Sequence, residues 1–343
     1  MRRKYIAGWM AVVLAGAALA LGIVACGDDD EGTGGTAEQH RIDLALDFYV
    51  NPDHAGVFAG IEKGYFEQEG LDVRPRVPSD PSAPIKQVAA GRADLAISYE
   101  PEVLLAKDQG LDVVSVAAIV DSPLTSLISV SKAGIESAAD LDGKTIATAG
   151  IPYQSDYLET VLATAGLSPS DVDEVNVGFN LLPAVIGGRA DAMLGGFRNV
   201  EGVDLRLRGL NPRVVPVDEL GVPTYDELVL VANGSVVEED PERIRGFISA
   251  LAEGTAYAVS HPQEASNFIL DAGRGLDPTL TRAEIDATLP LLESEPGQPY
   301  GSMDEAEWSA FAEWMADQEL LAEGPPEPGD VLTNELLPPA PSA

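Results

Sequence analysis

The sequence has a single cysteine, Cys26, and only three histidines. Without a second cysteine there is no disulfide framework, no thiolate metal site and no cysteine nucleophile in the body of the chain. The histidines His40, His54 and His261 are far apart in sequence and lack the spacing of metal ligands. Phosphate-binding P-loops, Gly-x-Gly-x-x-Gly turns after a strand and Gly-x-Ser-x-Gly elbows are also missing. We therefore expect a protein that is not an enzyme, with no catalytic residues, no metal and no cofactor.

Charge is absent from Ala7 to Ile23, a stretch that follows the basic residues Arg2, Arg3 and Lys4. This pattern predicts a signal peptide over residues 1–25. Ile23-Val-Ala-Cys26 resembles a lipobox, so Cys26 is expected to be lipidated and to become the mature N-terminus. The alternative is an uncleaved membrane anchor, because about 17 to 25 apolar residues can span a bilayer. Residues 26–40 are polar and glycine-rich, which predicts a flexible tether.

Basic residues are few, at 21 against 56 acidic ones, and the net charge of −35 becomes −38 without Arg2, Arg3 and Lys4. A body this acidic is not expected to bind nucleic acid, and an anionic membrane surface would repel it. Membrane attachment would therefore depend on the lipid at Cys26. The charge says little about the ligand.

The stretch from Arg41 to Phe66 predicts a strand, an aromatic corner and a helix. Apolar residues alternate from Ile42 to Phe48, as in a strand. Asn51 and Pro52 are a favoured N-cap and first helical residue, and Gly64 is a favoured residue after a helix end. Phe48, Tyr49 and His54 would then lie at the carboxyl end of a strand, where open α/β sheets bind ligands.

An internal repeat predicts two copies of one α/β lobe. Gln87–Ile97 and Ala184–Leu194 both contain a Gly-Arg-Ala-Asp turn between an apolar helix end and a short buried strand. Each strand leads to a candidate site loop, at Ser98–Pro101 and at Gly195–Phe197. The first segments of the two copies correspond as well, since Arg41–Phe48 and Gly143–Gly150 each precede a proline-containing helix start.

Several motifs resemble bacterial substrate-binding proteins of ABC importers, in the group that handles the pyrimidine precursor of thiamine and in riboflavin-binding relatives. They are Asn51-Pro-Asp-His-Ala-Gly56, Lys63-Gly-Tyr-Phe66, Ser98-Tyr-Glu100, Ile151-Pro152 and Gly195-Gly-Phe…Glu201. The resemblance covers roughly residues 41 to 320. It implies a two-lobed type II periplasmic-binding-protein fold with the ligand in a cleft between the lobes. It also implies that the protein acts outside the cytoplasm and delivers its ligand to the transmembrane subunits of a permease. We expect a monomer.

The expected organisation follows from this resemblance. Lobe 1 would comprise residues 41–129 and, after the chain returns, 230–322, with lobe 2 at 130–229. Leu124–Ser131 and Val222–Asn233 would be the extended crossings between the lobes. Helical apolar spacing is found at Pro241–Ser260, Arg282–Leu292 and Asp304–Leu321. The proline-rich tail, 323–343, is expected to be irregular and unpacked.

The candidate ligand-binding residues are aromatic, carboxylate and amide side chains, which suit a flat, nitrogen-rich heterocycle. Alternation of Phe48 and Tyr49 means that at least one of them faces the core or the helix layer. His54 could instead cap its helix, Glu100 could bond local backbone and Glu201 could simply begin a helix. The full set is Phe48, Tyr49, Asn51, His54, Tyr99, Glu100, Thr125, Pro152, Tyr153, Phe197, Asn199 and Glu201.

The ligand itself has alternatives. Many relatives in the pyrimidine group have Trp at the position of Phe48 or Tyr49, and a Phe-Tyr opening would also suit the larger ring system of riboflavin. Alkanesulfonate or nitrate would require a cation in the cleft, for which Arg198 is the candidate. A synthase branch of the family carries a cysteine-rich run that this chain lacks, and a sensor lobe acting on a receptor is a further possibility.

Overall fold

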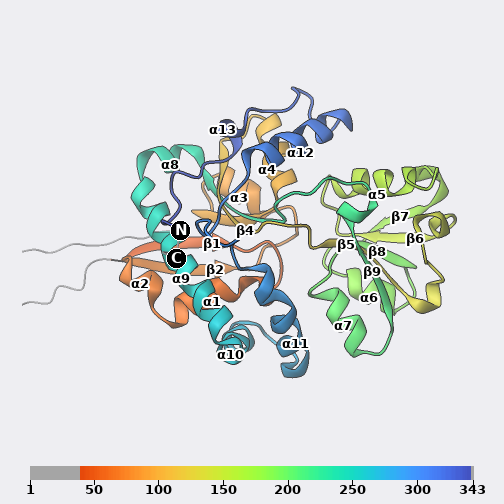
Figure 1. Cartoon of the computed structure of the whole chain (residues 1–343), viewed down its shortest axis with the longest axis horizontal. Coiled ribbons are helices and arrows are strands. Elements are labelled where there is room, and N and C mark those ends of the chain that lie inside the picture. The colour runs from red at the N-terminus through yellow and green to blue at the C-terminus, as the bar shows by residue number, and fades with distance from the viewer. Residues whose placement is uncertain (1–38, 341–343) are drawn as a thin grey trace, which may run out of the picture. The chain divides into compact units, whose positions relative to one another are not determined.

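Two five-stranded sheets, each flanked by helices, form the framework of the chain. The computed structural model describes residues 39–340. The first sheet contains β1 (His40–Ala45), β2 (Leu71–Arg76), β3 (Leu95–Ser98), β4 (Val113–Val120) and β10 (Leu228–Asn233). The second contains β5 (Thr125–Val130), β6 (Thr145–Thr148), β7 (Asp173–Asn176), β8 (Ala192–Phe197) and β9 (Pro212–Pro216). The expected α/β class is therefore confirmed (Figure 1).

We use lobe 1 for the first sheet with its helices and lobe 2 for the second. The helices of lobe 1 are α1 (Ala55–Glu62), α2 (Tyr65–Gln68), α3 (Pro84–Ala89), α4 (Glu100–Asp108), α8 (Gly234–Glu239), α9 (Pro241–Ser260), α10 (Pro262–Ala272), α11 (Pro278–Thr288), α12 (Glu305–Asp317) and α13 (Pro328–Val331). Those of lobe 2 are α5 (Gln154–Ala163), α6 (Leu181–Ile186) and α7 (Glu201–Leu207). Short 3-10 helices include η1 (Pro52–His54), η5 (Val217–Leu220) and η6 (Leu289–Leu291).

The two sheets have matching topologies. The first has the order β2-β1-β3-β10-β4 and the second the order β7-β6-β8-β5-β9. In each, three parallel strands are followed by one strand that is antiparallel to both of its neighbours, β10 or β5. The chain enters each antiparallel strand directly after it crosses from the other sheet. Both lobes are thus built to one plan.

The Gly-Arg-Ala-Asp turns have the same structural role in both lobes. Asp94 accepts a hydrogen bond from the backbone N–H of Asp43 at 2.7 Å, and Asp191 accepts one from that of Thr145 at 3.0 Å. Each aspartate therefore ties the turn that precedes β3 or β8 to the adjacent central strand. The sequence repeat reflects this shared turn.

Helix α9 packs closely against α1 because glycine allows it. Gly254 of α9 packs directly on the backbone of Gly56 and Gly60 in α1, where a Cβ atom would collide with the carbonyl oxygen of Gly56. This contact fixes α1, whose preceding turn carries Phe48 to His54. The aromatic stripe of α12 is core, as expected, with Trp308, Phe311 and Met315 buried.

Two expectations about boundaries differ from the structure. Strand β1 ends at Ala45, so Phe48 and Tyr49 lie beyond it, because the side chain of Asp47 turns the chain by bonding His54 and Tyr99. The expected boundary between the lobes, after residue 129, would divide strand β5, but β5 pairs entirely within the second sheet. A strand buried on both faces gives no sequence signal for which sheet it joins.

The tail is packed, contrary to expectation. Leu332 forms a parallel bridge with Ser115 of β4, and the N–H of Thr333 donates to the carbonyl of Ser115 at 2.9 Å. Val331, Leu332 and Leu336 are buried. Prolines exclude long regular elements, but the apolar residues between them still cover the edge strand of the sheet.

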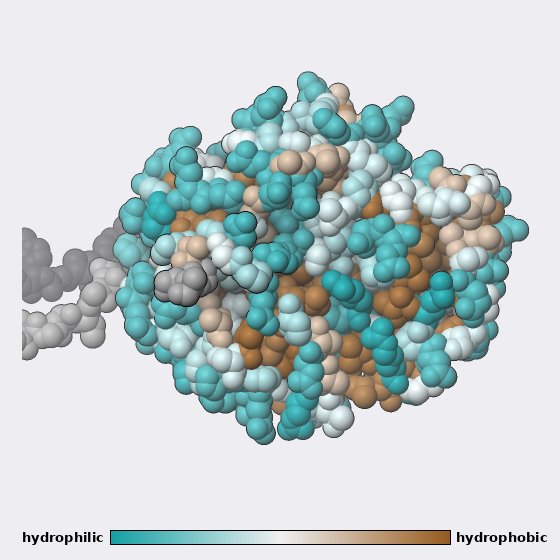
Figure 2. Space-filling model, in the orientation of Figure 1, coloured by the Kyte–Doolittle hydropathy of each residue, from teal (hydrophilic) through white to brown (hydrophobic). Residues whose placement is uncertain are grey.

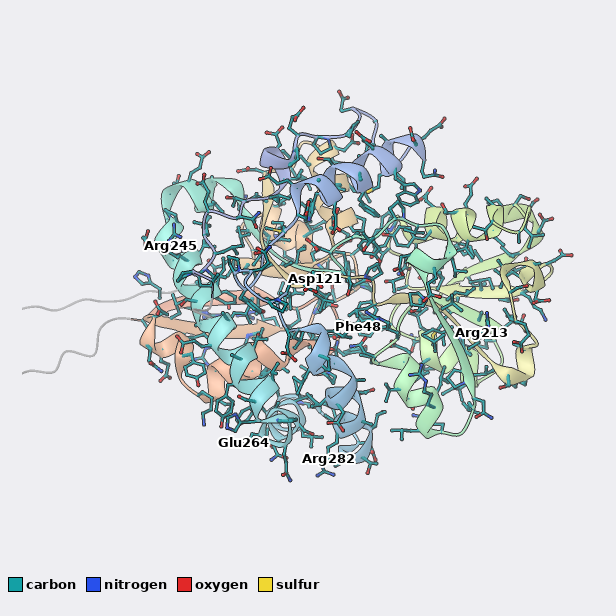
Figure 3. The ribbon with its side chains drawn as sticks, in the orientation of Figure 1. Phe48, Asp121, Arg213, Arg245, Glu264 and Arg282 are labelled. Carbon is teal, nitrogen blue, oxygen red and sulfur yellow. The ribbon has the colours of Figure 1, made fainter. Side chains whose placement is uncertain are left out.

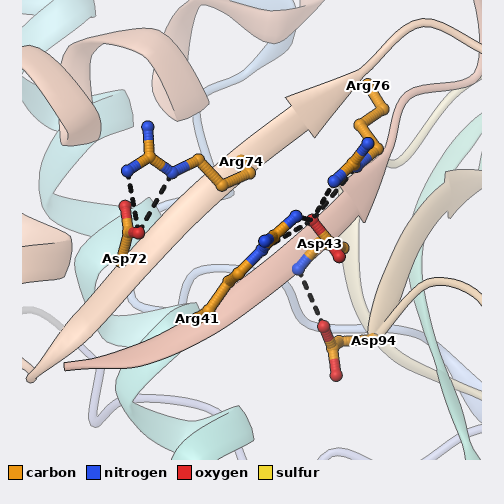
Figure 4. A network of polar contacts seen from close by, with 6 residues as sticks. All are labelled: Arg41, Asp43, Asp72, Arg74, Arg76 and Asp94. Atoms are coloured by element: carbon orange, nitrogen blue, oxygen red, sulfur yellow. Dashed lines mark hydrogen bonds and ion pairs between the residues drawn. The ribbon is translucent and has the colours of Figure 1, made fainter. Parts of the chain in front are cut away.

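Polar side chains dominate the exposed surfaces. On β1 and β2, Asp43 accepts from both Arg41 and Arg76, and Arg74 pairs with Asp72 (Figure 4). Such exposed pairs contribute about 0–1 kcal/mol each.

Apolar side chains gather in the middle of the face in Figure 2, where the lobes meet. Within residues 39–340, no helix is long and apolar enough to cross a membrane.

Candidate functional site

A cavity of about 170 Å³ lies between the lobes. Lobe 1 supplies the loop after β1, Tyr99 and the α10–α11 region, and lobe 2 supplies the loops before α5 and after β8. Figure 3 shows Phe48 at the junction of the two lobes. An apolar cavity of about 150 Å³ can hold a benzene ring, so this one matches a single six-membered ring with small substituents.

Asp47 organises the loop after β1. It accepts hydrogen bonds from Nε2 of His54 at 2.7 Å and from the hydroxyl of Tyr99 at 3.0 Å. The other ring nitrogen of His54 accepts the backbone N–H of Asn51, and Asn51 caps η1 by accepting the N–H of Asp53 at 2.8 Å. His54 is fully buried by these contacts. It therefore holds the corner on which Phe48 and Tyr49 are presented.

Aromatic rings surround the cavity and cross between the lobes. Phe179 of lobe 2 contacts Phe48 edge-on, with ring centroids 4.6 Å apart, and its centroid is also 4.6 Å from that of Tyr49. Deeper in the cleft, Tyr99 and Tyr153 meet edge to face at 6.3 Å. Desolvation raises the pKa of both tyrosines well above the ordinary value, so they remain neutral hydrogen-bonding groups.

The lobe 2 wall combines one carboxylate and one amide. Glu201, the first residue of α7, accepts the backbone N–H of Phe197 at 2.8 Å, and burial raises its pKa. Gln154 accepts the N–H of Ala149 at 2.8 Å and lies over Gly195. Gly195 has φ +106°, and a side chain there would collide with the Gln154 amide, so glycine is required for this wall.

The structure brings eight of the twelve candidate residues to the cavity: Phe48, Tyr49, Asn51, Tyr99, Thr125, Tyr153, Phe197 and Glu201. The other four lie outside its lining. His54 supports the corner as described, and Pro152 is exposed to solvent. Glu100 accepts the N–H of Asp226 at 2.7 Å, and Asn199 donates to Asp53 at 2.7 Å. Whether the eight bind a ligand remains a prediction.

Sequence reasoning missed the contribution of the α10–α11 region. Cavity-lining residues from this region are Ile269, Leu276, Asp277, Leu280, Thr281 and Glu284. They lie more than 200 positions after Phe48 in the sequence, and α11 was identified only as an apolar helix. A signal was present in the positions of Leu280, Thr281 and Glu284, which share one helix face.

The acidic residues that line the cavity are Asp47, Glu201, Asp277 and Glu284. Among residues 39–340, no lysine, arginine or histidine lines it. Burial and the neighbouring carboxylates Glu201, Asp204 and Asp53 raise the pKa of Glu284 to about 8. The cavity therefore favours ligands that present N–H or O–H donors and disfavours anions.

One buried glutamate joins the two segments that connect the lobes. Glu227, just before β10, accepts the backbone N–H groups of Leu124 and Thr125 at 2.8 and 2.7 Å, and the Thr125 hydroxyl at 2.9 Å. Tyr225 donates to it at 2.9 Å. Since Thr125 also lines the cavity, the connection between the lobes is mechanically linked to the cavity wall. Over the described range 39–340, His, Cys, Asp and Glu side chains form no group of three suited to a metal ion.

Comparisons with known proteins agree with this architecture. Residues 51–265 match the family described as NMT1/THI5 like. The chain is 36% identical to a Haemophilus influenzae protein named for thiamine biosynthesis over 284 residues, which is 82% of this chain and 88% of that protein. It is also 36% identical to the formylaminopyrimidine-binding protein of Halalkalibacterium halodurans over 283 residues, covering 82% and 86% of the two chains.

Solved structures show the same fold. The alkanesulfonate-binding protein SsuA from Xanthomonas axonopodis, bound to MOPS, superposes with a TM-score of 0.69 at 18% identity and covers 87% of this chain and 99% of its own. At this identity the likeness concerns the fold alone. It confirms the two-lobed periplasmic-binding-protein architecture that was expected from the sequence.

Proposed function

Since the chain belongs to the NMT1/THI5-like family, we propose that it is a solute-binding protein that captures an aminopyrimidine precursor of thiamine between its lobes. The observation that carries this proposal is the cavity, in which aromatic rings face acidic and amide groups and, of the residues that the structure describes, no basic one lines the wall. Rings cover the faces of a flat heterocycle, and the carboxylates accept hydrogen bonds from its N–H edge.

The cavity volume and charge support this ligand over the alternatives. About 170 Å³ accommodates one ring with small substituents, whereas the three fused rings of riboflavin need more space. Sulfonate or nitrate would need a buried cation, but Arg198 lies outside the lining and faces Ser122. The name of the Halalkalibacterium halodurans relative, a formylaminopyrimidine-binding protein, supports the same class of ligand.

A transport role fits better than catalysis. Relatives at 36% identity include one named as a binding protein, whereas the Legionella pneumophila relative that is named as a synthase is 26% identical over 254 residues. We infer that the protein acts outside the cytoplasm, is anchored through a lipid on Cys26 and delivers its ligand to a permease. Cys26 lies outside the described residues.

A thermal-shift screen tests the proposal. Purified protein would be heated with 4-amino-5-hydroxymethyl-2-methylpyrimidine, its formylamino analogue, riboflavin and an alkanesulfonate. A ligand at about 100 times its Kd should stabilise the folded state by about 2.7 kcal/mol, which raises the Tm by several degrees. We expect that shift with the pyrimidines. A shift with riboflavin alone, or with the sulfonate alone, would contradict the proposal and indicate that compound's class as the ligand.

A further inference from the structure

Among the acidic groups of the cavity, Glu284 differs because no hydrogen-bond donor in residues 39–340 contacts its carboxyl. Asp47 is bonded by His54 and Tyr99, Asp277 caps α11 by accepting the N–H groups of Thr279 and Leu280, and Glu201 accepts the Phe197 N–H. Within the part of the chain described, no group forms a hydrogen bond to the carboxyl of Glu284, although the residue is only 8% exposed. The carboxyl oxygens are not fully buried, so they remain open to the cavity, and a ligand that meets them there gains a hydrogen bond.

The surroundings of Glu284 keep its carboxyl protonated. Helix α11 packs against α7, α10 and η1. Burial is the main cause that raises the pKa of Glu284, and the carboxyl groups of Glu201 and Asp204 on α7 and Asp53 on η1 raise it further. Arg208, at the end of α7, is paired with Asp204. The remaining titratable groups on these elements are His54 on η1, Arg206 on α7, Glu264 and Asp271 on α10, and Asp277, Arg282 and Asp286 on or next to α11 itself.

A protonated carboxyl and an ionised one form hydrogen bonds with different kinds of ligand atom. The acid donates one O–H bond, whereas a carboxylate only accepts. An aminopyrimidine presents an acceptor and a donor side by side, the ring nitrogen and the exocyclic amine. Resting on the proposed function, we propose that Glu284 binds the ligand by donating its carboxyl O–H to the ring nitrogen, while Glu201 accepts from the neighbouring amine. The two residues together then select the N–C–NH2 edge.

Substitutions at Glu284 separate this role from others. Glu284→Gln keeps a donor of similar shape, so at pH 7 its affinity for 4-amino-5-hydroxymethyl-2-methylpyrimidine should remain within about threefold of the parent. Glu284→Ala removes the donor and leaves the ring nitrogen unpaired, so affinity should fall about tenfold or more. The matched control is Asp286→Asn, which removes an exposed carboxylate from the same helix.

The pH profile adds a readout that a purely structural role would not change. The parent should lose affinity as pH rises above about 8, because Glu284 ionises and its donor is lost. Glu284→Gln should lack this loss. If Glu284→Ala does not fold, the comparison of the parent with Glu284→Gln still decides.

Each outcome of these titrations has a distinct meaning. A parent that binds no aminopyrimidine overturns the proposed function and this inference together. A parent that binds, with Glu284→Ala as tight as Asp286→Asn, overturns only the inference. A loss of affinity in Glu284→Gln as large as that in Glu284→Ala would mean that Glu284 binds as an ionised acceptor, which also contradicts it.

Discussion

The amide of Asn199 donates a hydrogen bond to Asp53 at 2.7 Å, although the two residues belong to different lobes and lie 146 positions apart. The same amide nitrogen is 2.8 Å from the hydroxyl of Thr288 in lobe 1. Burial raises the pKa of Asp53 to about 7. This contact joins the two lobes beside the cavity, and we expect it to form only when the cleft is closed.

Asn199→Ala should favour the open arrangement. Two buried groups lose their partner, which costs about 1–3 kcal/mol and lowers ligand affinity about 5- to 100-fold when binding requires closure. Small-angle scattering should show the parent becoming more compact with ligand, and the variant less so. Asn180→Ala, at an exposed position of lobe 2, is the control. Equal affinity of both variants would contradict the role of this contact.

Glu227→Gln should destabilise the connection between the lobes. Both backbone N–H groups bond the same oxygen, Oε2, which the amide can keep, but its NH2 group then replaces the oxygen that accepts the Thr125 hydroxyl. We expect the free energy of unfolding to fall by about 1–2 kcal/mol in urea denaturation. The exposed Glu219→Gln should change it by less than about 0.5 kcal/mol. A Glu227→Gln effect as small as that of the control would contradict the assignment.

The protein should be more stable at pH 5.5 than at pH 8. Desolvation raises the pKa of buried Glu102 to about 7, so the folded state retains a proton that the unfolded chain has released. This proton uptake stabilises the folded state by on the order of 1–3 kcal/mol. The stabilisation is complete below about pH 4.5 and is lost as pH rises to about 7. Asp53 and Asp226, also raised to about 7, act in the same direction.

Glu102→Gln tests this dependence. The variant keeps a partner for Ser98, which donates to Glu102 at 2.8 Å, and removes the proton uptake. Its Tm should therefore change less between pH 5.5 and 8 than that of the parent or of the exposed Glu67→Gln. A parent that becomes more stable towards pH 8 would contradict the sign of the effect.

Cys26→Ser should abolish lipidation and leave the protein as unprocessed precursor in the membrane or released from it. The expectation rests on Cys26 following an uncharged apolar stretch, since this region lies outside the described residues. Metabolic labelling with a fatty acid, followed by membrane fractionation, gives the answer. A mutant that is processed and bound to the membrane like the parent would rule out the lipoprotein.

The sequence was most informative where local chemistry repeats. The aspartates of the two Gly-Arg-Ala-Asp turns, Asp94 and Asp191, make the same backbone contact, so their recurrence predicted two similar lobes. Strand ends predicted where Phe48, Tyr99 and Phe197 would lie, because the carboxyl ends of parallel strands share one edge of a sheet.

Contacts between distant segments could not be predicted. His54 was left open between ligand and cap, and only the position of Asp47 shows that it supports the corner. Glu284 resembled an ordinary polar residue on an apolar helix, because its burial depends on the packing of α11 against lobe 2. The tail was expected to be unpacked because prolines reveal the lack of regular structure but not the burial of Leu332 and Leu336.

Titration calorimetry with 4-amino-5-hydroxymethyl-2-methylpyrimidine, on the parent and on Glu201→Gln, tests the central claim most directly. A hydrogen bond to a charged group contributes about 1.5–3 kcal/mol, so the substitution should weaken binding roughly ten- to a hundredfold with little change in Tm without ligand. The account predicts saturable binding by the parent and this loss in the variant. Equal affinities, or tight binding of an alkanesulfonate in place of the pyrimidine, would contradict it.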